Sequence, residues 1–127
     1  MKVTIDNVVQ IADEVLVTFS TDFGNAAAVW SGVPPTIGAC HDVELEIEES
    51  VVWGESAIPA PKEDCSIGVM DGSINLTGKI ISVDAEGVVV FDVGGSITLI
   101  EIVGFTGAAP IFVDLKVGRL VLFPTGV

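Results

Sequence analysis

The sequence predicts an all-β protein, a single compact domain of about ten short strands closed into a barrel or stacked as a sandwich. Apolar residues recur with a period of two along most of the 127 residues, which is the period of a strand with one face in a core. The 14 glycines and 6 prolines interrupt the chain too often for a helix longer than a turn or two. Apolar runs also stay well short of the roughly 20 residues that a membrane-spanning helix needs.

The first part of the chain predicts two strands joined by a polar turn, then a short strand, and then the most regular alternation in the sequence. In that fourth segment Val43, Leu45 and Ile47 alternate with glutamates, so one face is expected in the core and the other in water. A bend at Glu49 and Ser50 leads into a fifth strand. The expected strands are 3–11, 15–19, 26–30, 43–47 and 51–53.

The second part repeats this order after a segment, residues 55–73, that contains Pro59 and Pro61 and is predicted as a linker. Its turns carry Asp, Gly or Pro, which favour tight reversals of the chain. The expected strands are 74–83, 88–91, 97–103, 113–117 and 120–123.

Two stretches of the chain align at a nearly constant offset. Residues 43–47 match 113–117 at an offset of 70, and the opening hairpins, beginning at Val3 and Ile74, align at an offset of 71. This indicates an internal duplication, with pseudo-repeats 3–54 and 74–124 inside one domain of residues 1–127, each with an OB-like five-strand plan. Alternating valines and leucines also align by chance, and in that case the fold is still all-β.

The chain is strongly acidic, with 18 acidic and 5 basic side chains and a formal net charge of -13. Such an excess repels nucleic acids and anionic membranes, so direct binding to either is not expected. Residues 1–66 hold 12 of the acids and 2 of the bases, which places most of the charge in the first half. The N-terminus shows no secretory signal, so a cytoplasmic location is expected, with Cys40 and Cys65 as reduced thiols in preference to a disulfide.

The motifs that normally carry chemistry are missing from the sequence. His41 is the only histidine, which excludes sites built on two imidazoles, and its neighbour Cys40 is expected on the opposite face of the strand. Residues 92–96 lack the lysine of a phosphate loop, and residues 84–87 are typical of a turn and not of a calcium loop. We therefore expect no enzyme, cofactor or metal site, although two acids that converge in the fold would escape this reasoning.

One cluster stands out as a candidate partner-binding site, because three of its glutamates share one face of a strand. A row of like charges suits either a basic partner or an edge strand kept apart from other sheets. The equivalent strand of the second half carries Asp114 and Lys116 outward, so solvation alone does not require a uniformly acidic row, and a partner is favoured. The predicted site comprises Asp42, Glu44, Glu46, Glu48, Glu49, Trp53 and Glu55.

These features favour a non-enzymatic, acidic protein-binding module. An inhibitor or immunity protein that covers the basic surface of a toxin or enzyme, for example one that acts on nucleic acids, fits best. Trp30 or Trp53 would supply the buried anchor of such an interface, or else fill the core. One alternative is a structural or assembly subunit, phage-like or homo-oligomeric, that associates through the apolar segment 97–103. A second is a barrel that binds a small molecule or a sugar at one mouth.

Overall fold

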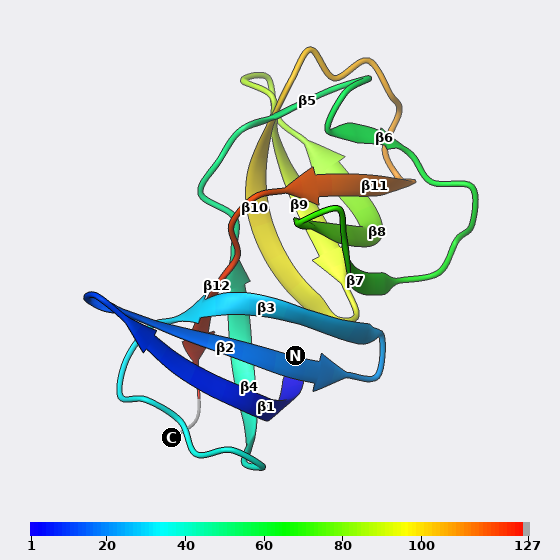
Figure 1. Ribbon diagram of the computed structural model, residues 1–127. Coiled ribbons are helices and arrows are strands. Elements are labelled where there is room, and N and C mark those ends of the chain that lie inside the picture. Colours follow the sequence, from blue (N-terminus) through cyan, green and yellow to red (C-terminus); the bar gives the residue numbers. More distant parts are fainter. Residues whose placement is uncertain (126–127) are drawn as a thin grey trace.

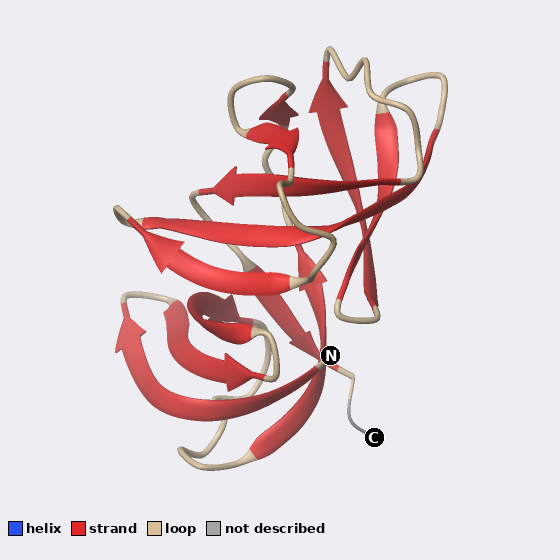
Figure 2. Ribbon diagram, turned by 90° about the vertical axis from the view of Figure 1, so that its right-hand side faces the viewer, coloured by secondary structure: helices blue, strands red, loops and turns tan. Residues whose placement is uncertain are grey.

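The computed structural model describes residues 1–125, and every regular element in this part of the chain is a strand (Figure 1, Figure 2). The twelve strands are β1 (Lys2–Ile11), β2 (Glu14–Thr21), β3 (Gly24–Trp30), β4 (Cys40–Glu46), β5 (Val51–Val52), β6 (Ala57–Pro59), β7 (Ser66–Met70), β8 (Ser73–Val83), β9 (Val88–Val93), β10 (Ser96–Val103), β11 (Ile111–Val117) and β12 (Val121–Pro124). The predicted all-β class is confirmed. Within residues 1–125, no helix is long and apolar enough to cross a membrane.

Five strands close into a barrel, here called the first barrel. β1 pairs with β2 and β2 with β3, both antiparallel, and β4 returns to pair with the other edge of β1. β12 fills the remaining gap, parallel to β3 and antiparallel to β4. Because every strand in this ring has two partners, a barrel and not a sandwich is formed.

The other seven strands form a second unit, which lies beside the first barrel (Figure 1). β8, β9 and β10 are consecutive antiparallel neighbours, β5 runs parallel to the end of β10, and β11 pairs with the other edge of β8. This order repeats the plan of the first barrel. The two units differ where the first barrel is closed by the pairing of β12 with β4. In the second unit the two residues of β5 do not pair with β11, and the short β6 pairs with β11 instead.

The fifth strands of the two units are exchanged. β5 follows β4 along the chain but pairs with β10 of the second unit, whereas β12 follows β11 but completes the first barrel. In Figure 1 the two connections cross between the units, one leading to β5 and the other to β12. Backbone hydrogen bonds secure both ends of the exchange, from the Ser31 amide to the Leu122 carbonyl and from the Trp53 amide to the Val103 carbonyl, each 2.9 Å long. Neither pseudo-repeat therefore keeps its own fifth strand: the second unit is the continuous stretch from β5 to β11, and the first barrel takes its last strand from beyond it.

Matching bulges shape the opening strand of each unit. The register of β1 shifts between Ile5 and Asn7, and that of β8 shifts between Ile80 and Ser82. A bulge increases local twist and bends its strand, which helps a small sheet to close. Just before each bulge a buried isoleucine lies opposite a buried phenylalanine, Ile5 opposite Phe19 and Ile80 opposite Phe91.

Apolar side chains fill the interior of both units as one connected core. Val3, Val17 and Val43 of the first barrel and Leu76, Val89 and Leu115 of the second unit are all at most 1 % exposed. The side chains that alternate with them along each strand point outward. This is the period of two from which the strands were predicted.

The segment 55–73, predicted as a linker, contains the short strands β6 and β7. β7 pairs with β8 and makes one parallel contact with the first barrel, where Ile67 lies opposite Gly24. A side chain at Gly24 would meet the carbonyl group of Ile67, so this close approach of the two units requires glycine.

Candidate partner-binding surface

The outward face of β4 carries three acidic residues of the predicted site. Asp42, Glu44 and Glu46 are exposed, and they alternate with Val43 and Leu45, which are buried in the first barrel. The predicted amphipathic strand therefore presents its carboxylates to solvent.

The neighbouring strands provide little positive charge beside this row. Asp42 lies opposite Lys2 of β1, and Glu44 lies opposite Phe123 of β12, which is 36 % exposed. Both ion pairs found among residues 1–125 involve Arg119 and neither reaches β4. Lys2 and the N-terminal ammonium, which donates to the Val43 carbonyl at 3.0 Å, lie near the Asp42 end of the row, and none of the three carboxylates forms an ion pair with a described residue.

Glu48 and Glu49 have a different environment, because they lie in the connection that crosses from β4 to β5. The Glu49 carboxylate accepts hydrogen bonds from the backbone amides of Gly118 and Arg119, at 2.8 and 3.1 Å. These amides belong to the other crossing connection, from β11 to β12. Glu49 and Arg119 occupy equivalent positions at the offset of 70, so the two crossing connections meet at equivalent points with opposite charges.

Arg119 binds the carboxylates at this crossing. Its guanidinium donates two hydrogen bonds to Glu14, one of them 3.2 Å long, and its Nε lies 3.6 Å from a Glu48 oxygen. The hydrogen bonds from Arg119 hold the pKa of Glu14 below its usual range, and the same contact raises the pKa of Arg119. Of the predicted glutamates, Glu48 and Glu49 therefore have partners within the chain.

The structure separates the two remaining members of the predicted site from the row on β4. Trp53 follows β5 in the second unit, where its ring packs edge-on against Phe105 with the ring centres 4.7 Å apart. Glu55 is exposed in the turn before β6, and its amide donates to the Val52 carbonyl. Neither residue lies on the strand that carries the acidic row.

Trp30, the other aromatic residue considered as an anchor, belongs to the core. It is only 4 % exposed, and its indole N–H donates to the Val33 carbonyl at 2.9 Å. Its ring also packs edge-on against His41, with the ring centres 5.1 Å apart. His41 thus contacts this tryptophan from β4, whereas its neighbour Cys40 is exposed with its sulfur 3.5 Å from the Thr4 hydroxyl.

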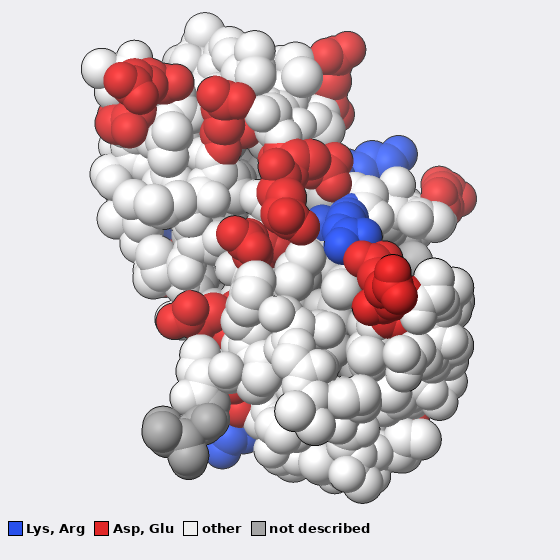
Figure 3. Space-filling view, turned by 90° about the vertical axis from the view of Figure 1, so that its left-hand side faces the viewer, with Lys and Arg blue, Asp and Glu red and all other residues white. Residues whose placement is uncertain are grey.

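The fold brings two further acids to the surface that the sequence analysis did not include. Asp13, from the β1–β2 turn, and Glu14, at the start of β2, line a surface depression of about 380 Å³ together with Glu46 and Glu48. Figure 3 shows acidic side chains gathered across the middle of one face of the molecule, with a basic group among them. Asp13 and Glu46 are 33 positions apart, and no spacing along the sequence signals the contact.

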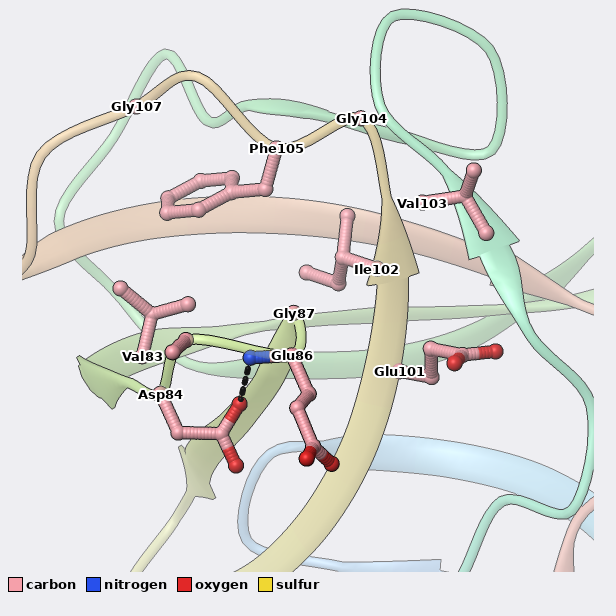
Figure 4. A pocket seen from close by; sticks show the side chains of 11 residues that line it. Val83, Asp84, Glu86, Gly87, Glu101, Ile102, Val103, Gly104, Phe105 and Gly107 are labelled. Atoms are coloured by element: carbon pink, nitrogen blue, oxygen red, sulfur yellow. Dashed lines mark hydrogen bonds between the residues drawn. The ribbon is translucent and has the colours of Figure 1, made fainter.

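A second depression, of about 500 Å³, occupies the corresponding end of the second unit. The β8–β9 turn and the loop after β10 face each other across it (Figure 4). Asp84 of the turn accepts hydrogen bonds from the Glu86 and Val88 amides, at 2.8 and 3.0 Å, so its carboxylate holds the turn together. Glu86 and Glu101 give this opening an acidic lining as well.

Among the described residues, no group of three or more His, Cys, Asp or Glu side chains is arranged to hold a metal ion. Cys40 and Cys65 are free thiols. No protein-family model, curated protein or solved structure matches the chain.

Proposed function

We propose that this protein is a non-enzymatic binding module whose acidic surface covers a basic protein partner. One observation carries the proposal: Asp42, Glu44 and Glu46 point outward from β4 with no cation of residues 1–125 within ion-pairing distance. A basic surface on a partner would supply the missing positive charge. A small inhibitor or immunity protein of a toxin or enzyme that acts on nucleic acids fits this description, because such targets present basic surfaces.

The spacing of the row favours a partner on electrostatic grounds. Glutamates two positions apart on a strand lie about 7 Å from each other. Two unit charges at that separation repel by about 0.6 kcal/mol in water, and by more where a protein surface excludes part of the solvent. A basic partner removes this repulsion, and the field of the whole acidic face speeds its approach.

The equivalent strand of the second unit provides an internal comparison. On β11 the outward Asp114 accepts a hydrogen bond from the Thr77 hydroxyl, and Lys116 follows it on the same face. The strand that corresponds to β4 thus carries one acidic and one basic residue on its outward face, with its carboxylate hydrogen-bonded, whereas β4 carries three carboxylates.

The strand order of the first barrel, closed by β12 parallel to β3 and antiparallel to β4, is compatible with an OB-like plan. Barrels of this type use the turn between the first two strands as part of a binding surface. In the first barrel that turn contains Asp13 and lies beside Glu46. The proposed interface therefore combines the row on β4 with the β1–β2 turn.

A charge-reversal experiment tests the proposal. The variant Glu44→Lys with Glu46→Lys is compared with a matched control, Glu63→Lys with Glu86→Lys, which makes the same change in net charge elsewhere on the surface. Binding to a panel of purified basic nucleases, and inhibition of their activity, is measured at low and moderate salt. We expect binding that weakens steeply with salt, falls at least tenfold in the β4 variant and changes little in the control.

Two results would count against the proposal. Binding that is indifferent to salt, or that falls equally in both double variants, would show that the row on β4 is not the recognition surface. Absence of binding to every nuclease of the panel would remove the inhibitor role.

A second candidate, a structural or assembly subunit, is supported by a different surface. Ile97, Leu99 and Val103 of β10 point outward and are 50, 63 and 49 % exposed. Large exposed apolar side chains on one strand are typical of a contact between subunits. Sedimentation over a range of concentrations checks the homo-oligomeric form, and a monomer at every concentration would exclude it.

A further inference from the structure

The outer face of β9 and β10 is apolar and has no partner among the described residues. Ile97 and Leu99 alternate along β10 with buried side chains, and Leu99 lies opposite Val90 of β9. The exposed Ile81, at the bulge of β8, adjoins the same surface. We call Ile81, Val90, Ile97 and Leu99 the β9–β10 face.

The corresponding surface of the first barrel is covered by the chain itself. Ala27 of β3, which matches Leu99 when Phe19 is aligned with Phe91, lines a cleft together with the half-buried Leu16 and Val29 and with Val69 and Ile74. The β7–β8 hairpin provides the last two residues and lies across this side of the first barrel. This outer surface thus faces apolar side chains of the β7–β8 hairpin in the first barrel and is exposed in the second unit.

The charges around the β9–β10 face indicate what would cover it. Asp92 lies opposite Ile97 within the sheet, and Glu101 follows Leu99 as the next outward residue of β10. The nearest cation of the sheet is Lys79, which lies opposite Asp92 with its ammonium 6.0 Å from the centre of the Phe112 ring. The apolar face is therefore bordered by Glu101 at one end and, at the other, by Asp92 with Lys79 as its cross-strand neighbour.

A second copy of this chain is a poor occupant for such a face. Each chain carries a net charge of -13, so pairing two copies through this face would bring two strongly acidic molecules together. A segment with apolar side chains and lysines or arginines beside them satisfies both parts of the surface.

We propose that the β9–β10 face is a docking surface for a segment of a different protein, one that alternates apolar and basic residues. Its apolar side chains pack on Leu99, Ile97 and Val90, and its basic side chains lie against Asp92 and Glu101. This surface is separate from the acidic row on β4, so the inference does not depend on the binding module proposed above, and it assigns to a different protein the residues of β10 that a homo-oligomer would use.

Synthetic peptides provide the probe. A short peptide alternating leucine and lysine is compared with one alternating leucine and glutamate and one alternating serine and lysine, each titrated into the ¹⁵N-labelled protein. We expect only the leucine–lysine peptide to shift the backbone amides of β9 and β10. We also expect Leu99→Lys to weaken its binding at least tenfold, because this change removes an apolar contact and adds a like charge to the face.

A matched variant controls for added charge. Ile11 is an exposed aliphatic residue of β1, 57 % exposed against 63 % for Leu99, so Ile11→Lys makes the same kind of change on another surface. It should leave the affinity for the leucine–lysine peptide within twofold of that of the unmodified protein. Amide spectra of both variants verify that the fold is retained.

The outcomes separate this inference from the function proposed above. Equal binding of the leucine–glutamate peptide, amide shifts confined to β4, or equal losses from Leu99→Lys and Ile11→Lys would overturn the docking surface. So would self-association of the unmodified protein that Leu99→Lys abolishes, because a second copy would then be the occupant. The variant Glu44→Lys with Glu46→Lys should retain the peptide shifts on β9 and β10 whether or not it still binds nucleases.

Discussion

Replacing Leu122 with alanine tests the exchange of strands directly. Leu122 lies on β12, is fully buried and packs in the core of the first barrel, although it comes after all strands of the second unit in the sequence. Leucine-to-alanine changes at such sites cost about 2–5 kcal/mol. That is a large part of the roughly 5–15 kcal/mol that stabilises a domain of this size. Taking about 3 kcal/mol and a denaturant dependence of about 2 kcal/mol/M, the urea midpoint should fall by about 1.5 M.

The two tryptophans allow each unit to be followed separately. Trp30 lies in the core of the first barrel, and Trp53 packs against Phe105 in the second unit. A Trp53→Phe background therefore reports on the first barrel, and a Trp30→Phe background reports on the second unit. Because the first barrel is closed by a strand that follows the whole second unit, and the two units share one connected core, Leu122→Ala should lower both midpoints by the same amount.

A matched control on the same strand is Phe123→Ala, since Phe123 is 36 % exposed. It should cost clearly less than the leucine change, because less of its side chain leaves the core. The reasoning would be refuted by a loss of stability confined to the Trp30 signal, which would mean that the units unfold independently. A loss below about 1 kcal/mol for Leu122→Ala would show that β12 does not pack as described.

Two further predictions concern stability. Gly78→Ala should destabilise the protein by about 1–3 kcal/mol in urea unfolding, because the new methyl group would lie 2.7 Å from the Phe91 ring. Gly68→Ala is the control, since a methyl group there meets nothing within 4 Å. Similar losses of stability from both variants would contradict the packing around Gly78. Glu14→Gln should reduce the loss of stability in acid. Arg119 lowers the pKa of the Glu14 carboxyl in the folded state, so the carboxylate stabilises the fold above its unfolded pKa. This stabilisation is lost as the pH falls through the folded-state pKa. Thermal unfolding between neutral pH and pH 3 measures this effect, and parallel curves for the variant and the unmodified protein would exclude it.

The period of two located most strands because each strand of this fold has one face in the core and one in water. It did not locate β6 and β7, which are short and lie in a stretch with two prolines. These strands exist because β11 and β8 offer edges for pairing, a tertiary cause that no local pattern records. Alignment of the pseudo-repeats placed residues 51–54 against 121–124 as equivalents, but it could not show that each joins the opposite unit.

The sequence likewise predicted only the part of the candidate site that lies on a single strand. Alternation alone put Glu44 and Glu46 on the outer face of β4. The partners of Glu48 and Glu49 lie about 70 positions away, at the crossing of the two connections, and only the fold brings them together. The fold, and no pattern in the sequence, also places Asp13 beside Glu46 on the acidic surface.

The exchange of strands also orders events during synthesis on the ribosome. β12 begins 75 positions after β4 ends, so at about 5–20 residues per second the first barrel waits about 4–15 s for its last strand. Throughout that time one edge of β3 and one edge of β4 are unpaired and available to other nascent chains. Glu44 and Glu46 lie on β4, one of the two strands with an unpaired edge, and their negative charge discourages pairing with another chain until β12 has been synthesised.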